Sequence, residues 1–121
     1  MQLSKAEEQL MQHLWEIEPA FMKDLLEAYP EPKPATTTLL TLLKRMMDKG
    51  FVTYTLFRNA RQYRPLVSKS DYFSKHLNGL IKDFFDDSAT QFASFFTQQT
   101  DLSKEELEVL KGIIDKELKR K

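Results

Sequence analysis

The segment from Pro34 to Gly50 has the pattern of one amphipathic helix with a signal at each end. Its apolar side chains recur at spacings of three and four residues, as on a buried helical face. They are Leu39, Leu42, Leu43, Met46 and Met47. The hydroxyl of Thr36 or Thr37 is predicted to cap the first turn. Gly50 is predicted to end the helix, because glycine adopts the left-handed conformation without steric cost.

The opposite face of this helix carries no acid before Asp48. It offers Thr37, Thr38, Leu40, Thr41, Lys44 and Arg45. Threonine hydroxyls can bond to base edges or phosphates, methyl groups can contact thymine, and arginine and lysine bind phosphates or guanine. This face is therefore predicted to enter the major groove of DNA. The alternative is an ordinary surface helix that is poor in acids.

The charges of the chain are unevenly distributed, although its formal net charge is zero. The first 32 residues are acidic, whereas residues 33–69 hold eight cations and one acid, a local net charge of +7. The eight cations are Lys33, Lys44, Arg45, Lys49, Arg58, Arg61, Arg64 and Lys69. A basic region of this kind is the electrostatic footprint of a protein that binds a polyanion. Chance clustering of charge is the alternative.

The segments before this helix predict the order of a helix-turn-helix. Residues 4–7 form a capping-box pattern that begins a first helix. The apolar face of that helix is predicted to contain Ala6, Leu10, Leu14 and Ile17. Residues 22–29 predict a short second helix. Three prolines between residues 30 and 34 then predict an extended connection, because proline disfavours a helical residue before it.

The segment after Gly50 predicts a β-hairpin. Residues 51–56 are rich in β-branched and aromatic side chains, residues 57–60 can turn, and residues 61–64 can return as a second strand. A hairpin directly after a helix-turn-helix is a wing. Arg58 at its tip and Arg61 close by could reach the DNA backbone or the minor groove. An ordinary hairpin with solvated arginines is the alternative.

From Ser70 onward, large apolar side chains predict three helices, with breaks at residues 86–88 and before a second capping box at residues 103–106. One short tail cannot hide this much apolar surface, so burial in a symmetric homodimer is predicted. The predicted interface residues are Phe84, Phe92, Phe95, Phe96, Leu107, Leu110 and Ile114. A bundle that packs on the N-terminal domain is the competing interpretation.

The sequence offers no pattern of an enzyme or a metalloprotein. It has no cysteine, which excludes disulfides, thiol catalysis and thiolate metal sites. It also has no glycine-rich phosphate loop, no evident pairing of histidine with an acid, no signal peptide and no apolar run that could span a membrane. We therefore expect a cytoplasmic protein without a catalytic site, cofactor, bound metal or small-molecule substrate.

Three segments together resemble a known family, in an order that covers nearly the whole chain. They are residues 3–15, residues 38–52 with 63–66, and residues 101–110. The first contains Leu3-Ser4 and Leu14-Trp15, and the second contains Leu42-Leu43 and Tyr63-Arg64-Pro65-Leu66. The chain resembles the penicillinase-repressor family of bacterial transcription regulators, the BlaI/MecI group.

The resemblance implies a winged-helix repressor that dimerises through its C-terminal helices and binds a palindromic operator. It also implies release by proteolysis, triggered by a membrane-embedded sensor metalloprotease, with a cut near Phe95-Phe96. The resistance repressors have an Asn-Phe pair there, and this chain has Phe-Phe.

The combined prediction is a mainly α chain with a small β-hairpin, in which residues 1–69 form a winged-helix DNA-binding domain and residues 70–121 form a helical dimerisation domain. The predicted function is sequence-specific repression by a homodimer bound to double-stranded DNA. The predicted DNA-binding residues are Lys33, Thr36, Thr37, Thr38, Leu40, Thr41, Lys44, Arg45, Arg58 and Arg61. The alternative is a winged-helix adaptor that binds protein. Steep salt dependence would distinguish DNA binding from such an interface.

Overall fold

The computed structural model describes residues 3–121 and divides into two compact units, one reaching to Ser74 and the other beginning at Lys75. The division falls inside helix α4 (Lys69–Phe84), so the first turn of that helix belongs to the first unit. The boundary predicted from the sequence, after residue 69, lies at the first residue of the same helix. No helix among residues 3–121 is both long enough and apolar enough to cross a membrane.

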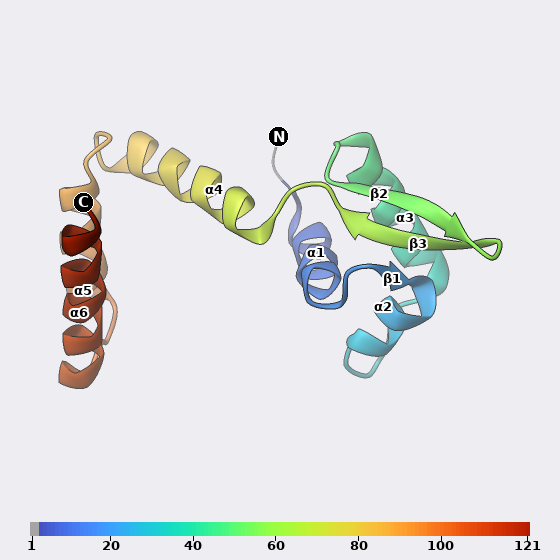
Figure 1. The fold of residues 1–121 in the computed structure, drawn as a ribbon, viewed down its shortest axis with the longest axis horizontal. Coiled ribbons are helices and arrows are strands. Elements are labelled where there is room, and N and C mark those ends of the chain that lie inside the picture. Colours follow the sequence, from blue (N-terminus) through green and yellow to red (C-terminus); the bar gives the residue numbers. More distant parts are fainter. Residues whose placement is uncertain (1–2) are drawn as a thin grey trace. The chain divides into compact units, whose positions relative to one another are not determined.

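The first unit is a winged helix (Figure 1). Its elements are α1 (Lys5–Ile17), β1 (Ala20–Phe21), α2 (Met22–Ala28), α3 (Thr36–Asp48), β2 (Val52–Phe57) and β3 (Ala60–Pro65), followed by the start of α4. The strands form one antiparallel sheet in the order β1-β3-β2. The predicted fold class, mainly α with a small hairpin, is confirmed. Strand β1 was not predicted, because two residues are too few to show an alternating pattern.

The hairpin turns more tightly than the sequence predicted. Only Arg58 and Asn59 lie between the strands, with φ angles of 50° and 67°. Positive φ at both central residues is the geometry of a type I′ turn, whose twist matches that of the flanking strands. Each strand consequently extends one residue beyond its predicted end toward the tip. Arg58 lies at the tip, as predicted.

Helix α3 ends as predicted and begins differently. Gly50 has a φ of +83°, its N–H donates to the carbonyl of Met47, and the next N–H, of Phe51, donates to Met46. These two bonds form a Schellman motif. The predicted threonine cap is wrong, because Ala35 is the N-cap residue and provides no side-chain bond. Its carbonyl already accepts from the N–H groups of residues 38 and 39, so Thr36 and Thr37 lie inside the helix.

The core of the first unit lies between α1, α2, α3 and the sheet. Its largest buried apolar side chains are Leu10, Met11, Leu14, Leu25, Leu39, Leu43, Met46, Val52 and Tyr63. The prediction for α1 was wrong at Ala6, which is exposed, whereas Glu7 is only 1% exposed. Apolar periodicity could not identify Glu7, because its burial depends on a charged partner from α3.

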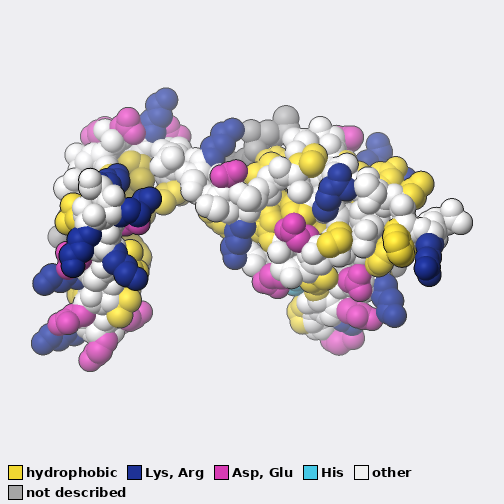
Figure 2. Space-filling view, viewed as in Figure 1, with side chains coloured by type: hydrophobic (Ala, Val, Ile, Leu, Met, Phe, Trp, Pro, Cys, Tyr) yellow, Lys and Arg dark blue, Asp and Glu magenta, His cyan; other side chains and the backbone are white. Residues whose placement is uncertain are grey.

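The second unit contains the rest of α4 with α5 (Ala89–Gln99) and α6 (Lys104–Arg120). The predicted break is confirmed: Asp86 and Asp87 have φ angles of 51° and 59°, and Ser88 caps α5. The capping box of Ser103 and Glu106 is also formed. None of the side chains of residues 75–121 is buried. Hydrophobic side chains therefore remain open on the surface of this unit (Figure 2).

Candidate DNA-binding surface

The exposed face of α3 is the centre of the candidate surface. All seven α3 side chains predicted to bind DNA are exposed: Thr36, Thr37, Thr38, Leu40, Thr41, Lys44 and Arg45. The hydroxyl of Thr41 donates to the carbonyl of Thr37 at 3.0 Å. While that bond holds, this hydroxyl can accept a hydrogen bond from a base but cannot donate one.

Leu40 lies at the edge of this face, next to the sheet. It lines a hollow of about 380 Å³ between α3, the start of α2, β1 and β3. The other lining residues are Phe21, Met22, Lys23, Ala60, Arg61 and Tyr63. Lys23 therefore lies at the junction between α3 and the wing. Sequence reasoning missed Lys23, because its place depends on the unpredicted strand β1.

The wing contributes two arginines that lie on aromatic rings. The Arg61 guanidinium lies 4.3 Å from the ring centre of Tyr54, and that of Arg58 lies 5.4 Å from Phe57. Neither has a carboxylate within 4.0 Å among residues 3–121. The rings contribute about 0.5–1 kcal/mol each at such exposed sites and leave the N–H donors available to phosphates.

Two of the cations that raise the local charge are already engaged within the first unit. The Lys33 ammonium donates to the carbonyls of Tyr29 at 2.7 Å and Leu26 at 3.2 Å, and thereby caps the end of α2. The Lys49 ammonium lies 2.7 Å from Glu7 Oε1. The remaining six cations of residues 33–69 form no ion pair within the described chain. They are Lys44, Arg45, Arg58, Arg61, Arg64 and Lys69.

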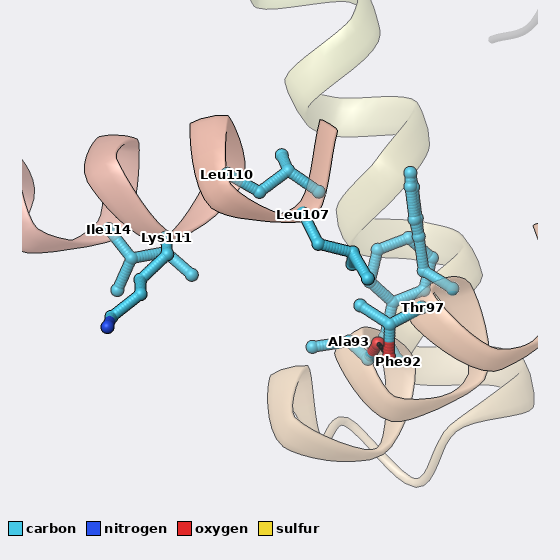
Figure 3. A pocket seen from close by; sticks show the side chains of 8 residues that line it. Phe92, Ala93, Thr97, Leu107, Leu110, Lys111 and Ile114 are labelled. Atoms are coloured by element: carbon cyan, nitrogen blue, oxygen red, sulfur yellow. Dashed lines mark hydrogen bonds between the residues drawn. The ribbon is translucent and has the colours of Figure 1, made fainter. Parts of the chain in front are cut away.

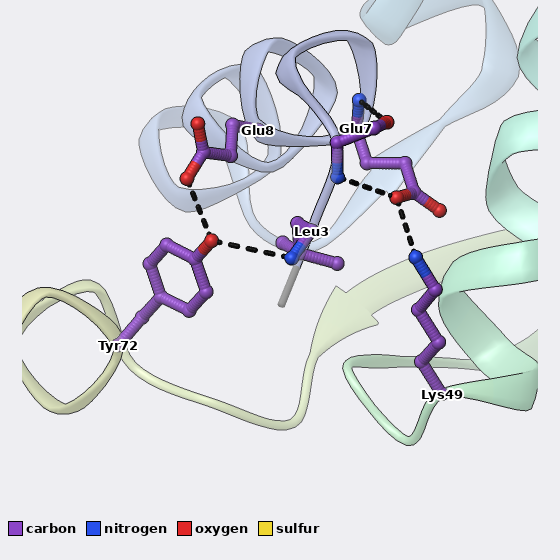
Figure 4. Close-up of polar contacts among 6 residues, drawn as sticks. Leu3, Glu7, Glu8, Lys49 and Tyr72 are labelled. Carbon is purple, nitrogen blue, oxygen red and sulfur yellow. Dashed lines mark hydrogen bonds and ion pairs between the residues drawn. The ribbon is translucent and has the colours of Figure 1, made fainter. Parts of the chain in front are cut away.

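The Glu7–Lys49 pair joins the first turn of α1 to the end of α3 (Figure 4). Glu7 Oε1 also accepts from the N–H of Ser4 at 2.7 Å. Burial raises the pKa of Glu7, but the bonds from Lys49 and Ser4 outweigh burial and hold that pKa below the ordinary value of 4.5. The carboxylate is therefore ionised at neutral pH. Its contacts fix the end of the helix whose exposed face carries the candidate DNA-binding residues.

The second unit brings most of the predicted interface residues together. An apolar hollow of about 420 Å³ lies between α5 and α6 (Figure 3). It is lined by Phe92, Phe96, Leu107, Leu110 and Ile114, together with Ala93, Thr97 and Lys111. Phe95 lies outside it, with its ring 5.3 Å from that of Phe85, and Phe84 is 74% exposed. Five of the seven predicted interface residues thus form one continuous apolar surface.

The structure gives no sign of a metal centre within residues 3–121, because no three His, Asp or Glu side chains are placed to bind one ion.

Sequence comparison relates this chain to known proteins. The family model of the penicillinase repressor matches residues 3–116. The methicillin resistance regulatory protein MecI of Staphylococcus aureus strain N315 is 28% identical over 116 residues, which are 95% of this chain and 94% of that protein. The penicillinase repressor of Bacillus licheniformis is 22% identical over 121 residues, covering 99% and 94% of the two chains.

Proposed function

Since this chain belongs to the penicillinase repressor family, we propose that it represses transcription by binding a palindromic DNA operator as a homodimer. Family membership makes it a transcriptional repressor and not an enzyme, as the sequence predicted. The operator, the homodimer and the mode of release are the proposed part. Binding to chromosomal DNA would place the protein in the cytoplasm.

One observation carries the proposal: an exposed helix face that has no acid before Asp48 lies in the same compact unit as two arginines, Arg58 and Arg61, that have no ion-pair partner there. On a solvated helix, cations are usually mixed with acids. Here the cations remain available for phosphates, and binding would release counterions from DNA. An interface with a protein partner would not require this charge pattern.

The geometry suggests which residues contact base edges and which contact phosphates. Thr37 and Thr41 lie along the middle of the exposed face of α3, so we assign them to base edges, with Thr36, Thr38 and Leu40 beside them. Lys44, Arg45, Arg58 and Arg61 are assigned mainly to phosphates. Lys33 could bind a phosphate only by giving up its contacts at the end of α2, so we expect it to contribute least.

The homodimer is proposed because residues 75–121 bury no side chain, although the hollow between α5 and α6 is almost wholly apolar. Covering that surface with the same surface of a second chain would remove it from water, and a two-fold interface permits this. Two linked reading units would then bind a palindrome more tightly than one, because the second contact is intramolecular.

The proposal extends to release by a membrane-bound sensor protease. The bond between Phe95 and Phe96 lies inside α5, with Phe95 half exposed and Phe96 half-buried. Proteases cut chain segments that open from regular structure. Cleavage here would therefore require α5 to unfold locally before the bond is cut.

The decisive experiment is selection of bound sequences from random duplex DNA with the purified full chain, followed by a salt titration on the selected sequence. A palindrome, and an affinity that falls steeply with salt, would support the proposal. Absence of any enriched sequence, together with salt-independent retention of a protein partner, would favour the adaptor and contradict operator binding.

A further inference from the structure

The first turn of α1 holds two other helices through neighbouring carboxylates (Figure 4). Glu7 binds Lys49 at the end of α3, as described above. Glu8 Oε2 accepts from the hydroxyl of Tyr72, in the first turn of α4, at 2.6 Å. One turn of α1 therefore contacts both the helix that carries the candidate reading face and the helix that leaves the first unit.

The contact with Tyr72 is enclosed. Tyr72 is only 6% exposed, and its oxygen also accepts from the N–H of Leu3 at 3.4 Å. Its ring meets that of Phe51 edge-on at 5.8 Å and lies 6.0 Å from that of Trp15. Burial and the bond to Glu8 raise the pKa of Tyr72 to about 12, so its hydroxyl remains a donor at neutral pH.

Two further contacts hold the approach to α4. The Trp15 indole N–H donates to the carbonyl of Val67 at 2.8 Å, and the hydroxyl of Ser68 accepts from the N–H of Asp71 at 3.0 Å. Helix α4 then continues without a break to Phe84, across the division between the units. The contacts of Tyr72 therefore act on the start of the helix whose later turns belong to the second unit.

We propose that Tyr72 is a positioning residue, whose bond to Glu8 fixes the direction in which α4 leaves the DNA-binding unit and thereby the half-site spacing that the dimer accepts. This inference rests on the proposed function. It goes beyond a role in the core, because the ring of Tyr72 packs on Phe51 and Trp15, whereas its hydroxyl joins the first turn of α4 to Glu8 on α1.

The spacing between half-sites provides the test, because each added base pair moves one half-site about 3.4 Å along the duplex and rotates it. Tyr72→Phe keeps the ring and removes the hydroxyl, and Glu8→Ala removes the acceptor from the other side. Glu16→Ala is the matched control, since Glu16 lies near the other end of α1, is exposed, and accepts only from Gln12 among the hydrogen bonds described.

The measurement is the affinity of each full-length variant for duplexes carrying a single half-site, the selected palindrome, and palindromes with one or two base pairs inserted or removed. We expect half-site affinity to change less than about twofold in both variants. The loss of affinity caused by altered spacing should shrink by about threefold or more, because a looser linkage tolerates more separations. Glu16→Ala should keep the parent profile.

Two results would overturn the inference: a spacing profile identical to that of the parent, or an equal loss on half-site and palindrome, which would make Tyr72 a folding residue. If Tyr72→Phe fails to fold, Glu8→Ala decides alone. If the parent binds no duplex, the proposed function fails first and this inference falls with it. A parent that binds its palindrome while both variants keep its profile contradicts this inference only.

Discussion

The two units of this molecule differ in how much apolar surface they enclose. In the first unit, Leu10, Leu14 and Leu43 are completely buried between helices and sheet. In the second unit, every side chain keeps part of its surface in contact with solvent, and Leu118 is 69% exposed. Burial of apolar surface is the dominant favourable term in folding. The first unit therefore encloses a core of its own, whereas the apolar face of the second unit stays open and is the surface that we propose to pair with a second chain.

Separating the two units should weaken binding to the palindrome more than any single substitution. A fragment ending at Ser74 keeps the complete core, including Tyr72, and should fold. We expect it to bind a single half-site like the full chain and to bind the palindrome about 10²–10⁴-fold more weakly, because the second contact is no longer intramolecular. Titration of both proteins on both duplexes measures this. Equal affinity for the palindrome would show that the helical unit does not link two reading units.

A second prediction compares one leucine from each unit. Leu43→Ala removes a fully buried side chain and should lower the free energy of unfolding by about 2–5 kcal/mol at any protein concentration. Leu107→Ala, at a side chain 40% exposed, should act mainly by weakening association. Its effect on the melting temperature should therefore depend on protein concentration. Concentration-independent melting of the parent and of Leu107→Ala would contradict the difference between the units.

A third prediction concerns the ion pair that holds α3. Lys49→Met leaves the buried carboxylate of Glu7 without its cation and should destabilise the first unit by about 3 kcal/mol. This value is at the lower end of the range for breaking a buried ion pair, because Lys49 is partly exposed. Lys44→Met, on the exposed face, is the control and should change stability by less than about 0.5 kcal/mol. Urea unfolding of both variants measures the difference.

The sign of the pH dependence sharpens this prediction. The folded-state pKa of Glu7 lies below 4.5, so the pair's contribution is present above that value and is lost as the pH falls through the folded-state pKa. The stability difference between parent and Lys49→Met should therefore shrink in acid, where Glu7 is protonated in every state. A difference that stays constant with pH would assign the effect to packing of the lysine stem.

Removing a single arginine should change the salt dependence of DNA binding only slightly, and only when the arginine belongs to the first unit. Arg58→Ala should reduce the slope of binding against salt by about one, on specific and scrambled duplexes alike, because one phosphate contact is lost. Arg120→Ala is the matched control, since Arg120 is equally cationic but forms an ion pair with Glu117 in α6. It should leave the slope unchanged. Equal slopes for both variants would remove Arg58 from the DNA-binding surface.

The sequence predicted the parts of the fold that depend on residues close together in the chain. The spacing of apolar residues identified α3, glycine identified its end, and the two aspartates before Ser88 identified the break before α5. The parts that it could not predict depend on contacts between distant segments. Strand β1 exists because β3 pairs with it, and Glu7 is buried because Lys49 reaches it from 42 residues away.

In the candidate site, too, features set by nearby residues were predicted and features set by distant contacts were not. The exposed face of α3 could be predicted from one helical period, and Arg58 from its place in a turn. Contacts between elements decide the rest: Lys33 caps α2, Lys23 lines the hollow at the α3–wing junction, and Tyr72 binds α1. None of these three contacts has a signal in the residues beside it.

We propose that one unit reads DNA and that the other joins two copies of the chain. Native mass spectrometry can count the chains bound to the selected palindrome, with a duplex carrying one half-site for comparison. We expect two chains on the palindrome, and dimers of the chain without DNA. One chain per palindrome, or a chain that remains monomeric at every concentration, would contradict the claim.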